Sequence, residues 1–223
     1  MTRHFLACGS AFFSTALRLL LALFSLALWV PAHALQVTDD RGVTVQFTQS
    51  PQRIVSLMPS LTESVCAMAQ CQRLVGVDRY SNYPASVRSL PQLGGHVDPN
   101  IEAIVALRPD VVLLATTSRA TARLESLGIK VIALDAQRHT DVQRVLQKIG
   151  VLLEVPEEAG ATRLWRLIDA SMSAAAQSLT PAARNVQVYF EVNRGPYAAG
   201  ESSFIGETLQ RLGVKNIVPA ELG

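Results

Sequence analysis

Short apolar runs alternate with helical segments through the middle of the chain, and this alternation constrains the fold more than any other feature. Residues 101–107 and 120–127 have a helical pattern, and each is followed by an apolar run, at 111–115 and 129–134. Short apolar runs of this kind are typical of parallel strands that are buried on both faces. The pattern therefore predicts an α/β fold in which helices cover both sides of a parallel sheet.

The segments that precede this repeat supply further strands. Residues 35–39 and 43–47 alternate apolar and polar side chains around Asp40-Arg41-Gly42, which predicts a β-hairpin. Short strands are also predicted at residues 53–57 and 74–77.

Helices are predicted on either side of the repeat. The first covers residues 61–69, where Ser60 or Thr62 provides the N-cap and Glu63 lies in the first turn. The second covers residues 141–153.

A longer amphipathic helix is predicted over residues 156–179. Pro156 suits the first turn of a helix, and apolar residues then recur along one face, at Leu164, Ile168, Met172, Ala175 and Leu179. Such a helix is roughly 35 Å long at 1.5 Å per residue. It is either an ordinary surface helix with a kink or a strut between two lobes.

A second α/β lobe is predicted to begin after the long helix. Residues 185–192 form a predicted strand, 193–200 a loop, and 204–212 a helix that ends at Gly213. About forty residues are too few to close a second sheet of ordinary size, so this lobe is predicted to be incomplete. The predicted parts are a signal peptide (1–34), an N-terminal α/β lobe (35–155), an inter-lobe helix (156–179) and the start of a truncated C-terminal α/β lobe (180–223).

The first 34 residues resemble a cleaved secretory signal. Arg3 and Arg18 lie in an acid-free leader, residues 19–30 are apolar, and residues 31–34 offer small side chains to a signal peptidase. The alternative is a transmembrane anchor, but the run is shorter than the roughly 20 residues that span a bilayer. Cys8 precedes the apolar core, where it is badly placed for lipid modification. We therefore expect a periplasmic protein.

Removal of the leader changes the charge and the cysteine count. The whole chain has 20 basic and 18 acidic residues, and the leader holds two basic residues and no acidic one, so 18 of each remain. The zero net charge gives no indication of a nucleic-acid partner. Cys66 and Cys71 could form a disulfide in an oxidising compartment if the helix ends between them. A buried free Cys66 is the alternative.

The sequence contains none of the common catalytic motifs. It has no G-x-S-x-G, H-E-x-x-H, phosphate-binding or dinucleotide-binding pattern. Without the leader the only histidines are His96 and His139, and His139 is interpreted as a solvated neighbour of a helix cap. An α/β hydrolase or transferase, and a receptor for free zinc or manganese, are the rival classes. Scarcity of metal-ligating side chains disfavours the second.

The long connection over residues 77–102 is the predicted functional segment. It contains Tyr80, Tyr83, the pair Gly94-Gly95 and His96. Long ordered connections in compact domains are usually functional.

Several short motifs occur in an order that resembles a known family. They are Arg53-Ile54-Val55-Ser56-Leu57, Pro59-Ser60-Leu61-Thr62-Glu63, Val75-Gly76-Val77, Tyr80-Ser81-Asn82-Tyr83-Pro84, Asp98-Pro99-Asn100-Ile101-Glu102, Leu107-Arg108-Pro109-Asp110-Val111-Val112 and Gly128-Ile129-Lys130-Val131. In this order they resemble the iron-siderophore and vitamin B12 class of periplasmic solute-binding proteins of ABC importers. The resemblance implies two Rossmann-like lobes bridged by one long rigid helix. It also implies a monomeric receptor without enzymatic activity or cofactor, which binds a small metal chelate and docks on membrane permease subunits.

The same resemblance implies roles for individual residues. Tyr80 and the loop that contains Ser60 line the ligand cleft, and Tyr197 is a candidate for the cleft wall in the second lobe. Glu102 lies on the lobe surface and docks an arginine of the permease. His96 is a polar contact or an axial ligand to cobalt or haem iron, because neutral imidazole is a common metal ligand.

The vitamin B12 branch is indicated by the Tyr-Ser-Asn-Tyr-Pro motif, and cobalamin or another corrinoid is therefore the expected ligand. That branch tends to have a tryptophan where this chain has His96 and an aromatic residue where it has Ala115. These differences leave a ferric siderophore or haem as alternative ligands. No second docking carboxylate can be assigned in this sequence.

Overall fold

The computed structural model describes residues 34–184, 186–195 and 197–222. The predicted signal peptide lies outside these residues except for Ala34. No helix in the described part of the chain is long and apolar enough to cross a membrane.

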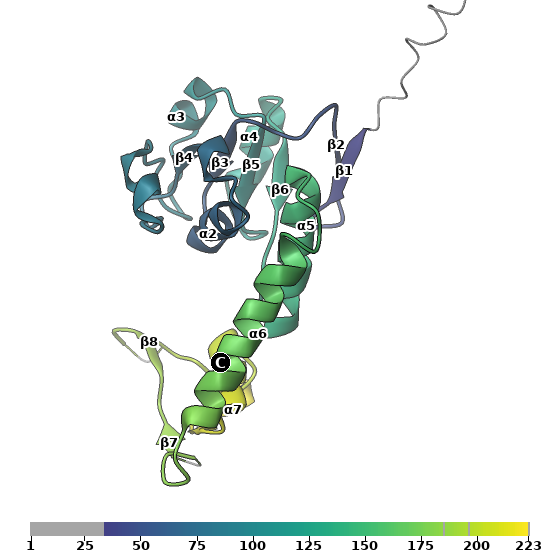
Figure 1. Ribbon diagram of the computed structural model, residues 1–223. Coiled ribbons are helices and arrows are strands. Elements are labelled where there is room, and N and C mark those ends of the chain that lie inside the picture. The colour runs from purple at the N-terminus through teal and green to yellow at the C-terminus, as the bar shows by residue number, and fades with distance from the viewer. Residues whose placement is uncertain (1–33, 185, 196, 223) are drawn as a thin grey trace, which may run out of the picture. The chain divides into compact units, whose positions relative to one another are not determined.

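A four-stranded parallel sheet forms the centre of the fold (Figure 1). Its order is β4 (Leu74–Val77), β3 (Ile54–Ser56), β5 (Val111–Leu114) and β6 (Val131–Ala133). Ile54 pairs with Val111, and Val112 pairs with Val131. All four residues of β5 are inaccessible to solvent, which is why this strand shows no polar alternation. The predicted α/β fold with a parallel sheet is confirmed.

Helices cover both faces of this sheet. On one face, helices α2 (Pro59–Ala67) and α5 (His139–Leu153) pack on Ile54, Val111, Leu113 and Ile132. On the other face, α3 (Ile101–Ala106) and α4 (Thr121–Ser126) pack on Val55, Val112, Leu114 and Val131. Alternate residues of each strand thus enter opposite cores, as the period of two requires.

The predicted hairpin is confirmed as strands β1 (Leu35–Thr38) and β2 (Thr44–Phe47). The Asp39 carboxylate accepts hydrogen bonds from the backbone N–H groups of Arg41 (2.9 Å) and Val43 (3.0 Å) and so closes the turn. Gly42 adopts a φ of 80°, which favours glycine. The Asp40 N–H donates to the Ala133 carbonyl (2.9 Å), which fixes the hairpin beside β6.

The predicted N-cap of the first helix is wrong. Helix α2 begins at Pro59, and its N-cap is Met58, which makes no side-chain capping bond. Pro59 suits the first helical position because it lacks the N–H that would have no partner there. Ser60 and Thr62 therefore lie inside the first turn.

The other helices of this lobe follow the predicted pattern closely. The Asn100 side chain caps α3 by accepting a hydrogen bond from the Ala103 N–H (3.0 Å). Gly128, with a φ of 77°, follows the end of α4. Helix α5 begins at His139, two residues before the predicted start. Two short 3₁₀ helices, η1 (Cys71–Arg73) and η2 (Ala85–Ser89), flank β4 and the following loop.

The long helix starts later than predicted. Helix α6 covers Ala161–Ser178, and residues 156–159 form a turn before it. The cause is Gly160, a poor residue for a helix interior. Its Cα lies so close to Val155 that a Cβ there would be 2.8 Å from the Val155 side chain. The helix of 18 residues is roughly 27 Å long at 1.5 Å per residue.

The segment after α6 contains short strands and one helix. Strand β7 (Gln187–Val188) pairs with β10 (Lys215–Asn216) in parallel, and β8 (Glu191–Asn193) pairs with β9 (Tyr197–Ala198) in antiparallel orientation. The single strand predicted over 185–192 is therefore wrong, because residues 189 and 190 separate β7 from β8. Helix α7 (Phe204–Leu212) and its end at Gly213, where φ is 80°, are as predicted. The 3₁₀ helix η3 (Ala220–Leu222) follows β10.

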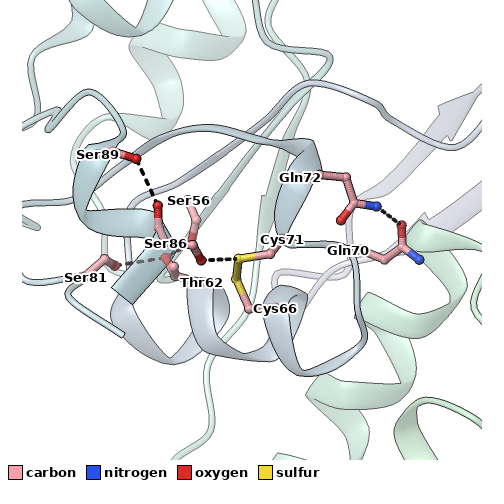
Figure 2. Close-up of a disulfide and its surroundings, with 9 residues drawn as sticks. All are labelled: Ser56, Thr62, Cys66, Gln70, Cys71, Gln72, Ser81, Ser86 and Ser89. Atoms are coloured by element: carbon pink, nitrogen blue, oxygen red, sulfur yellow. Dashed lines mark hydrogen bonds between the residues drawn. A yellow bond between two sulfur atoms is a disulfide. The ribbon is translucent and has the colours of Figure 1, made fainter. Parts of the chain in front are cut away.

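The two cysteines are joined by a disulfide (Figure 2). Helix α2 ends at Ala67, between Cys66 and Cys71, so the condition that the sequence set for this bond is met. The bond joins the end of α2 to η1 just before β4.

Candidate ligand-binding site

The carboxyl ends of β3, β4 and β5 form the edge at which ligands bind in parallel sheets. Strand β3 lies between β4 and β5, so the chain leaves β3 toward one neighbour and later returns to its other side. Ligands bind at such topological switch points in open α/β sheets. The segments that leave these three strands contain Ser60, the long loop with Tyr80 and His96, and Thr117.

Tyr80 follows β4 by three residues and presents its ring to solvent, with 63% of the residue exposed. Its backbone N–H donates to the Asp78 carboxylate (3.1 Å). Asp78 is 1% exposed, so a rigid buried group holds the backbone of an exposed aromatic residue. This arrangement suits contact with a large apolar ligand.

His96 lies next to this tyrosine. A Cβ placed on the buried Gly95 would be 3.4 Å from the Tyr80 ring, so that ring packs against the backbone beside His96. The exposed imidazole lies with its Nε2 3.2 Å from the Thr117 hydroxyl. Thr117 follows β5, and the contact therefore joins the long loop after β4 to the segment after β5, on the other side of β3.

Backbone and ion-pair contacts bring the two ends of the long loop together. The Arg79 N–H donates to the Gly94 carbonyl (2.8 Å), and the Arg79 guanidinium pairs with Asp98. Asp98 also accepts a hydrogen bond from the Gly95 N–H (3.1 Å). These contacts hold the backbone that precedes His96 against the part of the loop that carries Tyr80.

Ser60 belongs to the same edge. It is exposed in the first turn of α2, two residues before the buried Thr62. The Thr62 and Ser81 hydroxyls lie 2.9 Å apart, and Ser81 follows Tyr80 directly. The structure therefore brings together the segments of three predicted residues, Ser60, Tyr80 and His96.

The other two predicted residues lie elsewhere. Tyr197 is an exposed residue of β9, and no contact within the described part of the chain joins it to Tyr80 or His96. Glu102 is exposed in the first turn of α3 and forms no ion pair with any described residue. A free surface carboxylate is compatible with a docking role.

Some residues of this edge, after the ends of β5 and β6, were not identified from the sequence. Besides Thr117, these are Thr116 and Asp135, which form a pair: the Thr116 N–H donates to the Asp135 carboxylate (2.9 Å), and the Thr116 hydroxyl bonds to it as well. The signal that could have found them is position, because each lies two or three residues after the end of a buried strand, at the carboxyl edge of the sheet.

A charged cluster lies beside the end of β6. Asp40 binds Arg144 and Lys148 of α5 (2.7 Å to the Lys148 ammonium) and accepts a hydrogen bond from the Asp135 N–H (2.9 Å). Burial alone would raise the pKa of the Asp40 carboxyl, but hydrogen bonds from Arg144 and Lys148 outweigh it and hold that pKa below its ordinary value. The cluster therefore fixes the hairpin, β6 and α5 relative to one another.

The interpretation of His139 as a solvated cap neighbour is wrong. Its ring is half-buried against Phe204 of α7, with centroids 4.7 Å apart, and its Nε2 lies 2.8 Å from the Thr208 hydroxyl. The backbone N–H of His139 donates to the Glu207 carboxylate (2.8 Å). His139 thus joins α5 to α7 and takes no part in the candidate site.

The candidate residues form an open surface. Cavities of about 530, 280 and 210 Å³ are lined by other residues, the largest by Glu201, Gln210, Asn216 and their neighbours in the C-terminal segment. The described residues include no group of three or more His, Cys, Asp or Glu side chains that could hold a metal ion. His96 can therefore offer one ligand to a metal that other atoms already chelate.

Comparison with known proteins assigns the family. Residues 54–222 match the Periplasmic binding protein family, and the chain belongs to that family.

Individual relatives agree with this assignment. The chain is 28% identical over 201 residues to the uncharacterized ABC transporter substrate-binding lipoprotein YvrC of Bacillus subtilis, covering 84% of this chain and 62% of that protein. It is 32% identical over 186 residues to a cobalamin-binding protein of Halobacterium salinarum, covering 80% and 49%. Among solved structures, a periplasmic heme binding protein from Pseudomonas aeruginosa is 31% identical with a TM-score of 0.64, covering 76% and 63%.

These comparisons show the class of protein and how much of each relative's length the chain covers. The family consists of binding proteins and not of enzymes, which excludes the hydrolase alternative. The chain spans between about half and two thirds of the length of the three relatives named above.

Proposed function

We propose that this protein is the extracytoplasmic solute receptor of an ABC importer, and that it binds a corrinoid such as cobalamin and delivers it to a membrane permease. The observation that supports this proposal is that the segments containing Ser60, Tyr80 and His96 meet at the switch point of the parallel sheet. A large, mostly apolar chelate requires exposed aromatic surface with a few polar groups, and these residues supply both. The cobalamin-binding relative supports the choice of ligand.

Haem is the second candidate ligand. The exposed His96 imidazole and the likeness to a periplasmic heme binding protein both favour it. A ferric siderophore would use the same surface without an axial histidine.

The remaining roles belong to the same proposal. Residues 35–155 form the N-terminal lobe, α6 joins it to the C-terminal segment, and Tyr197 contributes to the far wall of the ligand site. Glu102 docks the receptor on an arginine of the permease, since it is exposed and unpaired among the described residues. The receptor acts outside the cytoplasm as a monomer.

A titration of the purified chain tests the ligand. Cobalamin, cobinamide, haem and a ferric siderophore are added separately, and binding is followed by calorimetry and by thermal shift. We expect saturable binding of cobinamide or cobalamin. Binding of haem alone would select the second candidate, and no response to either corrinoid would reject the corrinoid assignment.

A further inference from the structure

A buried chain of hydroxyl groups joins α2 to the segment that carries the tyrosines. The Thr62 hydroxyl lies 2.9 Å from the hydroxyls of both Ser56 and Ser81, which share its single hydrogen as acceptors. Ser81 in turn donates to the Asp78 carboxylate. All four side chains belong to residues that are at most 2% exposed, so water does not compete for these contacts.

This chain ends at the backbone of Tyr80. One oxygen of Asp78 binds Ser81, and the other accepts the Tyr80 N–H (3.1 Å). Thr62 is completely buried and cannot touch a ligand at the surface. The hydroxyl contacts of Thr62 lead through Ser81 and Asp78 to the backbone of Tyr80.

A second attachment holds the far end of the same segment. Cys71 is joined to Cys66 at the end of α2, and its sulfur lies 3.6 Å from the Ser86 hydroxyl in η2 (Figure 2). The segment is thus attached at two places: Ser81 contacts Thr62 near the start of α2, and Ser86 contacts the disulfide at the end of α2. Tyr83 lies between these two attachments.

We propose that Thr62 is a positioning residue for the ligand site, whose hydroxyl fixes the backbone on which Tyr80 stands. An exposed tyrosine on a loose loop would lose conformational entropy on binding, and a fixed backbone avoids that cost. The affinity part of this inference rests on the proposed function, whereas the structural part does not.

Four variants distinguish the effect of the Thr62 hydroxyl from the effect of the shape of the Thr62 side chain. Thr62→Val keeps the shape and removes the hydroxyl, and Thr62→Ser keeps the hydroxyl. Ser81→Ala breaks the same contact from the other side, in case Thr62→Val fails to fold. Thr44→Val is the control, because it makes the same substitution at a threonine outside the site, whose hydroxyl lies 2.8 Å from the Thr38 hydroxyl in the hairpin.

The first measurement needs no ligand. Amide hydrogen exchange is followed in peptides that contain Tyr80 and Ser81. We expect exchange there to rise roughly tenfold in Thr62→Val and Ser81→Ala and to stay at the wild-type rate in Thr62→Ser and Thr44→Val. Unchanged exchange in both hydroxyl-removing variants overturns the proposal, whatever the protein binds.

The second measurement tests the path to the ligand. With the corrinoid or haem that binds the wild-type chain, we expect Thr62→Val to weaken affinity roughly three- to tenfold and Thr62→Ser to restore it. In a Tyr80→Ala background, Thr62→Val should cause little further loss. If the losses of affinity caused by Thr62→Val and Tyr80→Ala were additive, the link from Thr62 to the ligand through Tyr80 would be overturned. If the wild-type chain binds no chelate, the proposed function fails, and the exchange measurement alone decides this inference.

Discussion

At the scale of single residues, the two described histidines have different surroundings. His96 is exposed beside Tyr80, with one contact to the Thr117 hydroxyl. His139 is half-buried and contacts Phe204, Glu207 and Thr208 of α7. Only His96 is free to reach a ligand at the carboxyl edge of the sheet.

We predict that His96→Ala changes the visible spectrum of bound cobinamide or haem. An axial imidazole alters the metal-centred bands, so its loss shifts them. Affinity should fall roughly tenfold, which corresponds to about 1.4 kcal/mol. Absorbance titrations of the wild-type and variant chains measure both quantities.

His139→Ala is the control for this prediction. It removes an imidazole outside the candidate site and should leave the absorption bands of the bound ligand unchanged. Identical spectra for wild type and His96→Ala would show that His96 does not coordinate the metal.

At the scale of elements, the sequence predicted the strands of the N-terminal lobe and most helices because burial determines them, whereas the short strands after α6 were predicted wrongly. Strand β5 is apolar throughout since both of its faces are covered. The start of α6 was predicted wrongly because the chain makes a separate turn between Val155 and Gly160, which the spacing of the apolar residues does not show. Likewise, Tyr80 and His96 could be identified as conspicuous residues of a long loop, whereas the contact of His96 with Thr117 depends on the order of the strands.

The cluster around Asp40 makes the stability of the sheet depend on pH. The folded-state pKa of Asp40 lies below its ordinary value, so the cluster stabilises the fold above the unfolded-state pKa of about 3.9. That stabilisation is lost as the pH falls through the folded-state value. Since the Asp40 side chain is 10% exposed and that of Arg144 is 38% exposed, water screens part of the interaction.

We predict that Asp40→Asn lowers the free energy of unfolding by about 1–2 kcal/mol at pH 7. The deficit should shrink as the pH is lowered through the acid range, because the wild-type carboxyl then becomes neutral as well. Urea unfolding at a series of pH values measures this difference.

Glu158→Gln is the matched control for Asp40→Asn. It removes the charge from an ion pair with Arg166 in which both side chains are more than two thirds exposed, and such pairs contribute little. A deficit in Asp40→Asn that did not vary with pH would contradict the role of its charge.

At the scale of the whole molecule, helix α6 connects the segments on its two sides through packing contacts. It packs against both α5 and α7, and Asp169 of α6 accepts a hydrogen bond from Arg211 of α7 (2.7 Å). His139 adds a direct contact between α5 and α7. Opening or closing by a large hinge motion would have to break these contacts.

We therefore predict that ligand binding causes only modest domain motion. Small-angle scattering of the chain with and without saturating ligand should give the same radius of gyration within error. As a comparison, Asp169→Ala removes the Arg211 contact and should allow a larger difference between the two states if that contact restrains them. A marked compaction of the wild-type chain on binding would contradict the prediction, because contacts that link three helices would then have to rearrange for each ligand captured.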